Sequence, residues 1–119
     1  MELDKFLFFC RISKQYKGCR YIRYAIEIIN DSEEKCFITK NIYPKIADRY
    51  NVSVTSIEHD IRTVVRIIWD KHQDIIKALF GYVPDRKPNN FQFIDAMAFA
   101  YRTILSGVNF PNKELCSIA

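Results

Sequence analysis

Residues 43–62 decide the fold of this chain and read YPKIADRYNVSVTSIEHDIR. Pro44 predicts the start of a short helix, because the N–H that proline lacks has no partner in the first turn of a helix. Asn51 then tolerates the left-handed backbone that a tight turn often requires. A second helix is expected to follow, with Ser53 or Thr55 as its N-terminal cap. The order of helix, tight turn and helix is that of a helix-turn-helix, a motif that reads DNA in the major groove.

The second of these helices, expected over about residues 54–70, has two unlike sides. At about 100° per residue, one side collects the apolar residues Ile57, Ile61, Val64, Val65 and Ile68. The opposite side carries Thr55, Glu58, His59, Arg62 and Arg66. Such a side can enter the major groove, where arginine bonds a guanine edge and glutamate accepts from a cytosine amino group. An ordinary solvated surface with a Glu58–Arg62 ion pair is the alternative interpretation.

The rest of the chain is also predicted to be helical, because apolar residues recur with helical spacing and glycine and proline are sparse. Besides the helix-turn-helix at about 43–70, helices are expected over about residues 3–11, 18–30, 74–80 and 89–105. Gly81 is a suitable C-terminal cap, and Asn89 or Asn90 can cap the last helix. We expect an all-α fold of about six helices, with one domain at residues 1–106 and a tail at 107–119. Trp69 and Phe80 are assigned to the core.

The charge of the chain is mildly basic and unevenly distributed. Its 119 residues carry a net charge of +4, and 49% of them are hydrophobic, which suits one compact domain. No acidic residue interrupts the basic run Arg11, Lys14, Lys17, Arg20 and Arg23. This run is either a solvated surface or a patch that meets phosphates or an acidic partner.

Several classes of protein are disfavoured. The four cysteines lack the spacing of a zinc or redox motif, so no metal is expected and the thiols are assigned as reduced. The apolar run at residues 6–10 is too short for a membrane span or a signal peptide, which predicts a cytoplasmic protein. The only histidines, His59 and His72, are tied to no nucleophile, and no glycine-rich phosphate loop is present. We therefore expect no catalytic residue, no cofactor and no small-molecule substrate.

A series of short strings runs in order from near the N-terminus to about Arg102. The strings are Lys17-Gly18, Tyr21-Ile22-Arg23, Ala25-Ile26-Glu27, Ile38-Thr39-Lys40, Tyr43-Pro44-x-Ile46-Ala47, Asn51, Ile57-Glu58, Ile61-Arg62, Trp69, Leu79-Phe80-Gly81-Tyr82, Lys87-Pro88-x-Asn90 and Phe93-Ile94. With this order and spacing, the chain resembles the C-terminal DNA-binding effector domain of the stage-zero sporulation response regulator of endospore-forming bacteria. The resemblance implies a six-helix domain whose fourth helix reads a short DNA box, often present in tandem copies. It also implies that the last helix helps to pair neighbouring domains.

The resemblance also implies roles for single residues. Glu58 and Arg62 match family positions that face bases, and Thr55, His59 and Thr63 complete the expected base-reading set. His59 stands where the family has another arginine, and Thr63 where it has a histidine, so a different sequence preference is expected. Phosphate contacts are expected from Thr39, Lys40, Lys45, Ser53, Ser56 and Arg66, of which Ser56 replaces a further basic residue.

Two functions are therefore weighed. The first is a sequence-specific transcription regulator that binds double-stranded DNA on the nucleoid, as a homodimer or as tandem copies paired through the last helix. Family members usually carry an N-terminal receiver domain, and this sequence shows none, so the chain is either a stand-alone relative or an excised domain. The alternative is a receiver-less interaction module that pairs with a full-length regulator. Phe91 and Phe99 are candidate surface aromatics for that pairing, whereas Phe93 and Tyr101 are assigned to the core.

Overall fold

The computed structural model describes residues 3–32 and 41–105, and the regular structure within them is helical. In chain order the helices are α1 (Leu3–Phe9), α2 (Lys17–Asp31), α3 (Tyr43–Tyr50), α4 (Val54–Lys71), α5 (Gln73–Phe80) and α6 (Asn90–Leu105). The expectation of an all-α fold with about six helices is thus confirmed. The tail expected at residues 107–119 lies outside the described residues.

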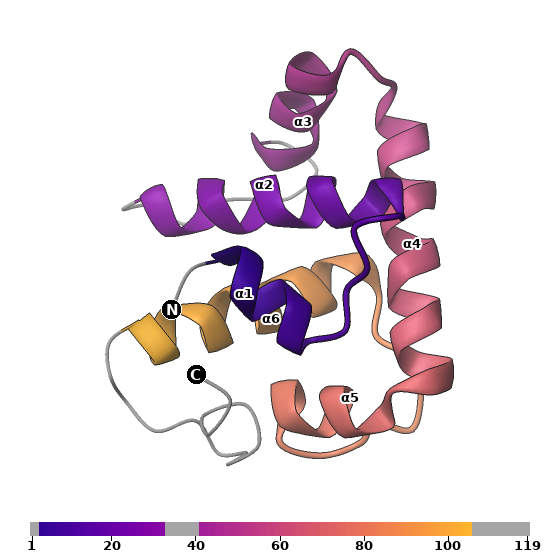
Figure 1. Ribbon diagram of the computed structural model, residues 1–119. Coiled ribbons are helices and arrows are strands. Elements are labelled where there is room, and N and C mark those ends of the chain that lie inside the picture. The colour runs from indigo at the N-terminus through magenta and orange to yellow at the C-terminus, as the bar shows by residue number, and fades with distance from the viewer. Residues whose placement is uncertain (1–2, 33–40, 106–119) are drawn as a thin grey trace.

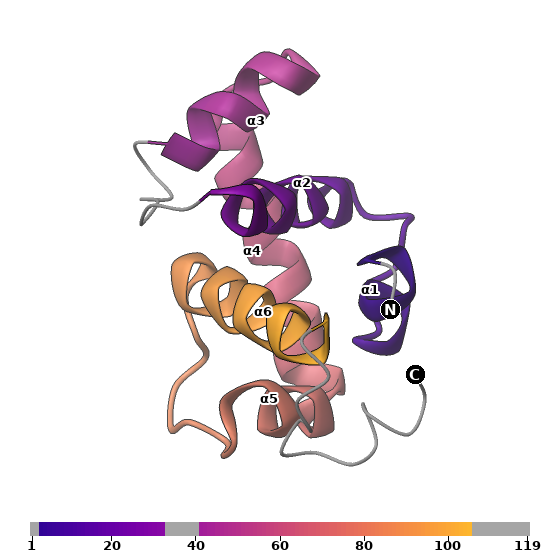
Figure 2. The same ribbon diagram turned by 90° about the vertical axis from the view of Figure 1, so that its left-hand side faces the viewer.

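Helix α4 is the longest described helix, and α2, α3, α5 and α6 pack on one side of it, whereas α1 packs against α2 (Figure 1). Helices α2 and α6 cross α4 one below the other, while α3 packs against the upper end of α4 and α5 against its lower end. Figure 2 shows the same arrangement from the side, with α2 and α6 in front of α4 and α1 beside them. No described helix covers the outer side of α4, at the right of Figure 1.

The core lies between α4 and the helices that cross it. The apolar side expected for α4 is buried as the spacing predicts, at Ile57, Ile61, Val64, Val65 and Ile68. Burial of one such side chain stabilises the fold by about 1.5–3 kcal/mol. Phe93 and Tyr101 of α6 are also buried, as expected. Trp69 and Phe80, which were assigned to the core, are only partly buried against it. Trp69 follows the fully buried Ile68 and is therefore turned by about 100° to the flank of α4.

Gly18 allows α2 to approach α4 with backbone against backbone. A Cβ atom at residue 18 would lie 2.8 Å from Cγ2 of Val64 and closer still to the carbonyl oxygen of Asp60. Heavy atoms cannot pack at such distances, so any larger residue would push the two helices apart. Gly18 thereby fixes the start of α2 beside the first half of α4.

Helix α1 ends two residues earlier than expected, because Arg11 adopts a left-handed backbone with φ of 60°. The N–H of Arg11 donates to the carbonyl of Phe8, and the N–H of Ile12 donates to the carbonyl of Leu7. These two bonds form the helix end in which a left-handed residue, most often glycine, closes the last turn. The sequence gives no sign of this cap, since arginine seldom adopts that conformation.

Candidate nucleic-acid interface

The turn between α3 and α4 is built as a helix-turn-helix requires. Asn51 adopts the left-handed conformation, with φ of 53° and ψ of 51°, and its N–H donates to the carbonyl of Ala47. Ser53 is the N-terminal cap of α4, and its Oγ accepts from the backbone N–H of Ser56 at 3.1 Å. Of the two caps considered, Ser53 is therefore the one used, and Thr55 lies inside the helix.

Asn90 joins the start of α6 to both helices of the motif. Its buried side-chain Nδ2 donates to the carbonyl oxygen of Glu58 at 2.9 Å and to the hydroxyl oxygen of Tyr43 at 3.3 Å. Burial raises the pKa of the Tyr43 hydroxyl. Asn89 caps α6, because its Oδ1 accepts from the N–H of Gln92 while the Gln92 side chain accepts from the N–H of Asn89. Asn89 is thus the cap, which leaves Asn90 free to brace α3 and α4.

The outer side of α4 presents the polar residues that the sequence places there. The exposed members of this surface, called the outer face of α4 from here on, are Thr55, Glu58, His59, Arg62 and Arg66. Nη2 of Arg62 and Oε1 of Glu58 form an ion pair at 2.6 Å, with side chains 54% and 48% exposed. An exposed pair with this spacing contributes only about 0.3–0.5 kcal/mol to stability. Glu58 accepts from Nη2 of Arg62, so other N–H donors of the guanidinium remain for a ligand.

The hydroxyl groups near this face are already partly used within the helix. Thr63 is half-buried, and its Oγ1 donates to the carbonyl oxygen of His59 at 3.1 Å. Oγ of Ser53 donates to Oγ of Ser56 at 3.0 Å in addition to its role as cap. The hydroxyl hydrogen of Ser56 therefore remains for an outside acceptor, whereas Thr63 keeps only its lone pairs.

The residues expected to contact phosphates are spread over more than one element. Arg66 lies on α4, one turn beyond Arg62, and is exposed. Lys45 is exposed in the first turn of α3, where it lines a groove with Glu27 and Asp31 of α2. Thr39 and Lys40 lie outside the described residues. The residues expected to read bases thus all lie on α4, while Lys45 comes from the neighbouring helix α3.

Residues 5–100 match the family described as sporulation initiation factor Spo0A, C terminal. This chain belongs to that family. The resemblance seen in the sequence is thereby confirmed, and with it the assignment to DNA binding and transcription regulation in sporulation. The Spo0A C-terminal family is a family of DNA-binding regulatory domains and not of enzymes.

Three further features concern membrane spans, metal sites and thiols among the described residues. None of the described helices is both long and apolar enough to cross a membrane. Within residues 3–32 and 41–105, no three histidine, cysteine or acidic side chains are grouped so that they could hold a metal ion. Burial raises the pKa of the Cys10 thiol to about 12, as suits an unreactive core residue.

Two residues that shape the interface were not singled out from the sequence for this role. Gly18 sets the distance between α2 and α4, and Asn90 holds the carbonyl of Glu58. Both stand in the strings shared with the family, Lys17-Gly18 and Lys87-Pro88-x-Asn90. Those strings were the available signal, but a string alone does not indicate which contact a residue makes.

Proposed function

We propose that this chain is a sequence-specific transcription regulator that inserts α4 into the major groove of double-stranded DNA. The observation that carries the proposal is the outer face of α4, which is polar, exposed and uncovered by any described helix. The turn at Asn51 and the brace at Asn90 hold this face in a fixed position relative to α3. A major groove about 12 Å wide admits one α-helix in this way.

Base reading is assigned to Glu58, His59, Arg62, Thr55 and Thr63. Arg62 can form two parallel hydrogen bonds to a guanine, and Glu58 can accept from the amino group of a cytosine. Glu58 and Arg62 stand about one helical turn apart on the same face, so both side chains can reach bases of one short box. Each well-formed pair of this kind discriminates by about 1–3 kcal/mol against the wrong base.

Phosphate contacts are assigned to Arg66, Lys45, Ser53 and Ser56, and, from the sequence alone, to Thr39 and Lys40. These contacts supply most of the affinity and fix the register, whereas the base contacts supply the selectivity. Ser56 is suited to donate its free hydroxyl hydrogen, and Ser53 holds the first turn of α4 in place. A protein with this role resides on the nucleoid.

The test is selection from a randomised duplex pool at near-physiological salt, followed by sequencing of the bound fraction. The proposal expects a short enriched motif that contains a guanine for Arg62. Comparison of that motif with the box of the family shows what His59 and Thr63 read. Binding that is weak, erased by salt and blind to sequence would contradict the proposal.

A second candidate function rests on the outer side of α6. Phe99 is 67% exposed and Phe91 48% exposed, although both are large aromatic residues. A chain that pairs through these rings with a full-length regulator would act as an interaction module and not as a DNA reader. Loss of DNA binding with retained pairing would favour this candidate.

A further inference from the structure

Helix α2 divides the basic run of the N-terminal part between two grooves. Arg11, Lys14 and Arg23 line a groove of about 840 Å³ beside α1. Lys17 lines a second groove of about 450 Å³, between the start of α2 and the first turns of α4. Arg20 borders both grooves. The run is therefore not one uniform patch, and each of its parts has its own surroundings.

The second groove, called the α2–α4 groove from here on, is continuous with the outer face of α4. Ser56 and His59 belong both to this groove and to the set assigned to DNA contacts. The groove borders α4 where Gly18 brings the two helices together at Asp60. A DNA strand that follows the outer face of α4 would therefore pass directly beside the start of α2.

Lys17 and Arg20, the two basic side chains of this groove, differ from Arg11 and Arg23 in their ion pairs. Arg11 is paired with Asp74, and Arg23 with Asp4 and Glu27. Lys17 and Arg20, in contrast, form no ion pair with any residue that the structure describes. Both are exposed. Their charges are thus available to an outside anion.

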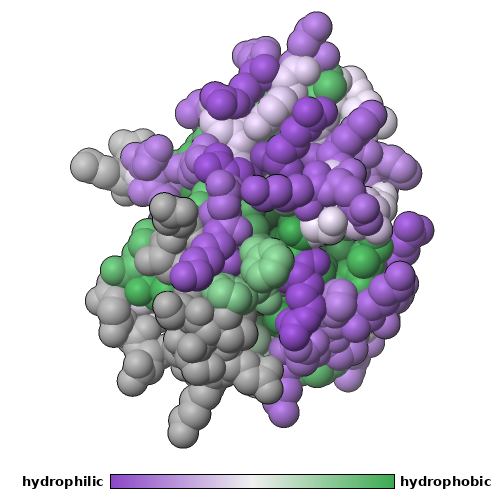
Figure 3. Space-filling view, viewed as in Figure 1, coloured by the Kyte–Doolittle hydropathy of each residue, from purple (hydrophilic) through white to green (hydrophobic). Residues whose placement is uncertain are grey.

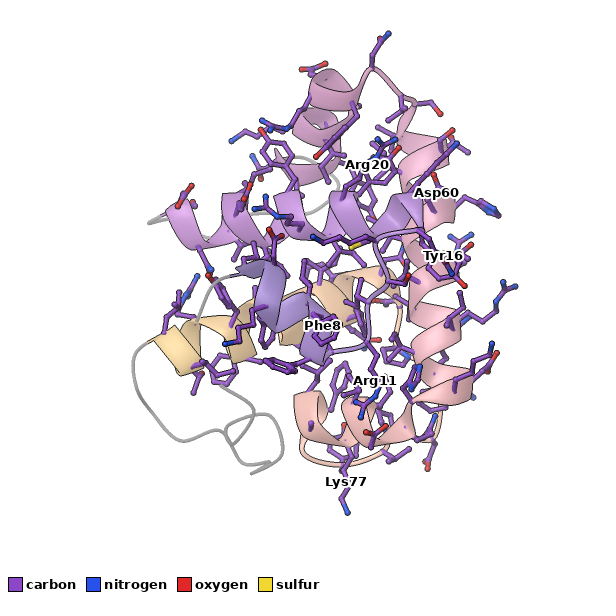
Figure 4. All side chains as sticks on the ribbon, in the orientation of Figure 1. Phe8, Arg11, Tyr16, Arg20, Asp60 and Lys77 are labelled. Atoms are coloured by element: carbon purple, nitrogen blue, oxygen red, sulfur yellow. The ribbon has the colours of Figure 1, made fainter. Side chains whose placement is uncertain are left out.

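Arg20 is also held in place without a carboxylate. Its guanidinium carbon lies 5.3 Å from the ring centre of Tyr21 and 5.1 Å from that of Tyr50. Figure 4 shows Arg20 between α2, α3 and α4, on the side of Asp60. An arginine that lies against aromatic rings has a restrained plane, while its N–H donors stay free for two parallel bonds to a phosphate. In the same orientation, the surface over α3 and the upper end of α4 is largely hydrophilic (Figure 3).

We propose that Lys17 and Arg20 bind a backbone phosphate of DNA beside the first turns of α4, as a contact outside the helix-turn-helix. The inference rests on the proposed insertion of α4 into the major groove. Asp60 lines the same groove, and its negative charge opposes the phosphate. The groove is thus expected to bind more weakly than its two basic residues alone would allow.

The proposal predicts opposite effects from variants within one groove. Lys17→Gln and Arg20→Gln should each lower the affinity about 5- to 10-fold at 0.1 M salt, on selected and random duplexes alike, and reduce the salt slope by about one unit. Asp60→Asn should instead raise the affinity on both duplexes. Lys77→Gln is the matched control, because Lys77 lies on α5 at the far end of the molecule and points away from the groove (Figure 4).

The measurement is fluorescence anisotropy on the full chain at several salt concentrations, with circular dichroism to check that each variant is folded. Arg20→Lys keeps the charge and should keep the salt slope, which separates charge from packing on Tyr50. The inference is overturned if Lys17→Gln and Arg20→Gln bind like Lys77→Gln, or if Asp60→Asn binds more weakly. Because those outcomes presuppose a chain that binds DNA, they leave the proposed function standing, whereas a wild-type chain that binds no duplex overturns both.

Discussion

Helices α4 and α6 are alike on their inner sides and unlike on their outer sides. Both bury a continuous apolar side in the same core. The outer face of α4 is charged and polar, whereas the outer side of α6 exposes Phe91 and Phe99. Charged donors and acceptors suit phosphates and base edges, while exposed aromatic rings suit another protein. The inner sides therefore explain the fold, and the outer sides distinguish the two candidate functions.

The two helices are also linked at one point. Asn90 stands at the start of α6 and holds the carbonyl of Glu58 on α4. The helix proposed to read bases is thus held by the helix proposed to pair with a neighbour. A change at this joint is expected to reach both surfaces, and the variants below test how far each helix acts alone.

The largest expected effect comes from the inner sides, where the helices should behave alike. Ile61→Ala on α4 should lower the free energy of unfolding by about 2–5 kcal/mol, and Phe93→Ala on α6 by about 3–5 kcal/mol, because both side chains are fully buried. Urea denaturation followed by circular dichroism measures both values. A loss below about 1 kcal/mol at either site would mean that this helix is not packed as described.

Gly18→Ala tests the close packing of α2 against α4. Alanine normally stabilises a helix by about 1 kcal/mol relative to glycine, but here the added methyl group would meet the carbonyl of Asp60. We expect a destabilisation of about 1–3 kcal/mol, measured by thermal unfolding. Gly81→Ala is the control, since that site has open space and only the strain of a positive φ. A more stable Gly18→Ala variant would contradict the close approach.

Asn90→Ala tests the joint between α4 and α6. The variant leaves the carbonyl of Glu58 and the hydroxyl of Tyr43 without this partner, which should lower the free energy of unfolding by about 1–3 kcal/mol. Asn89→Ala removes only the cap of α6 and should lower it by about 1 kcal/mol. Hydrogen exchange should show faster opening of the α3–α4 turn in Asn90→Ala alone. Equal exchange in both variants would argue against the brace.

The smallest effect concerns the pH dependence of the same joint. Burial raises the pKa of Tyr43 in the folded state, so folding favours the protonated hydroxyl. This stabilisation is complete below the unfolded value of about 10 and is lost as the pH rises through the folded value. Tyr43→Phe should therefore lose less stability between pH 8 and pH 10.5 than the wild type does. A wild type and variant with the same pH dependence would contradict the assignment.

Much of this architecture follows from local pattern. The inner side of α4 repeats with helical period, and Asn51 marks the turn, so both could be predicted from single residues and their spacing. The left-handed cap at Arg11 could not, because arginine seldom adopts that conformation and no neighbouring turn residue marks the position. The bond from Asn90 to the carbonyl of Glu58 joins residues far apart in the chain, so no local pattern predicts it. The base-reading roles of Glu58 and Arg62 stay predictions, because base contacts form only with DNA present.

The most direct test compares three variants on the duplex enriched by selection and on random duplex. Arg62→Ala should lose affinity about 5- to 150-fold for the selected duplex, equivalent to about 1–3 kcal/mol, with little change on random duplex. Arg66→Ala, one turn further along α4, should weaken both alike, and Phe99→Ser should leave binding to a single box unchanged. Equal losses on both duplexes for Arg62→Ala, or loss of single-box binding in Phe99→Ser alone, would contradict base reading by the outer face of α4.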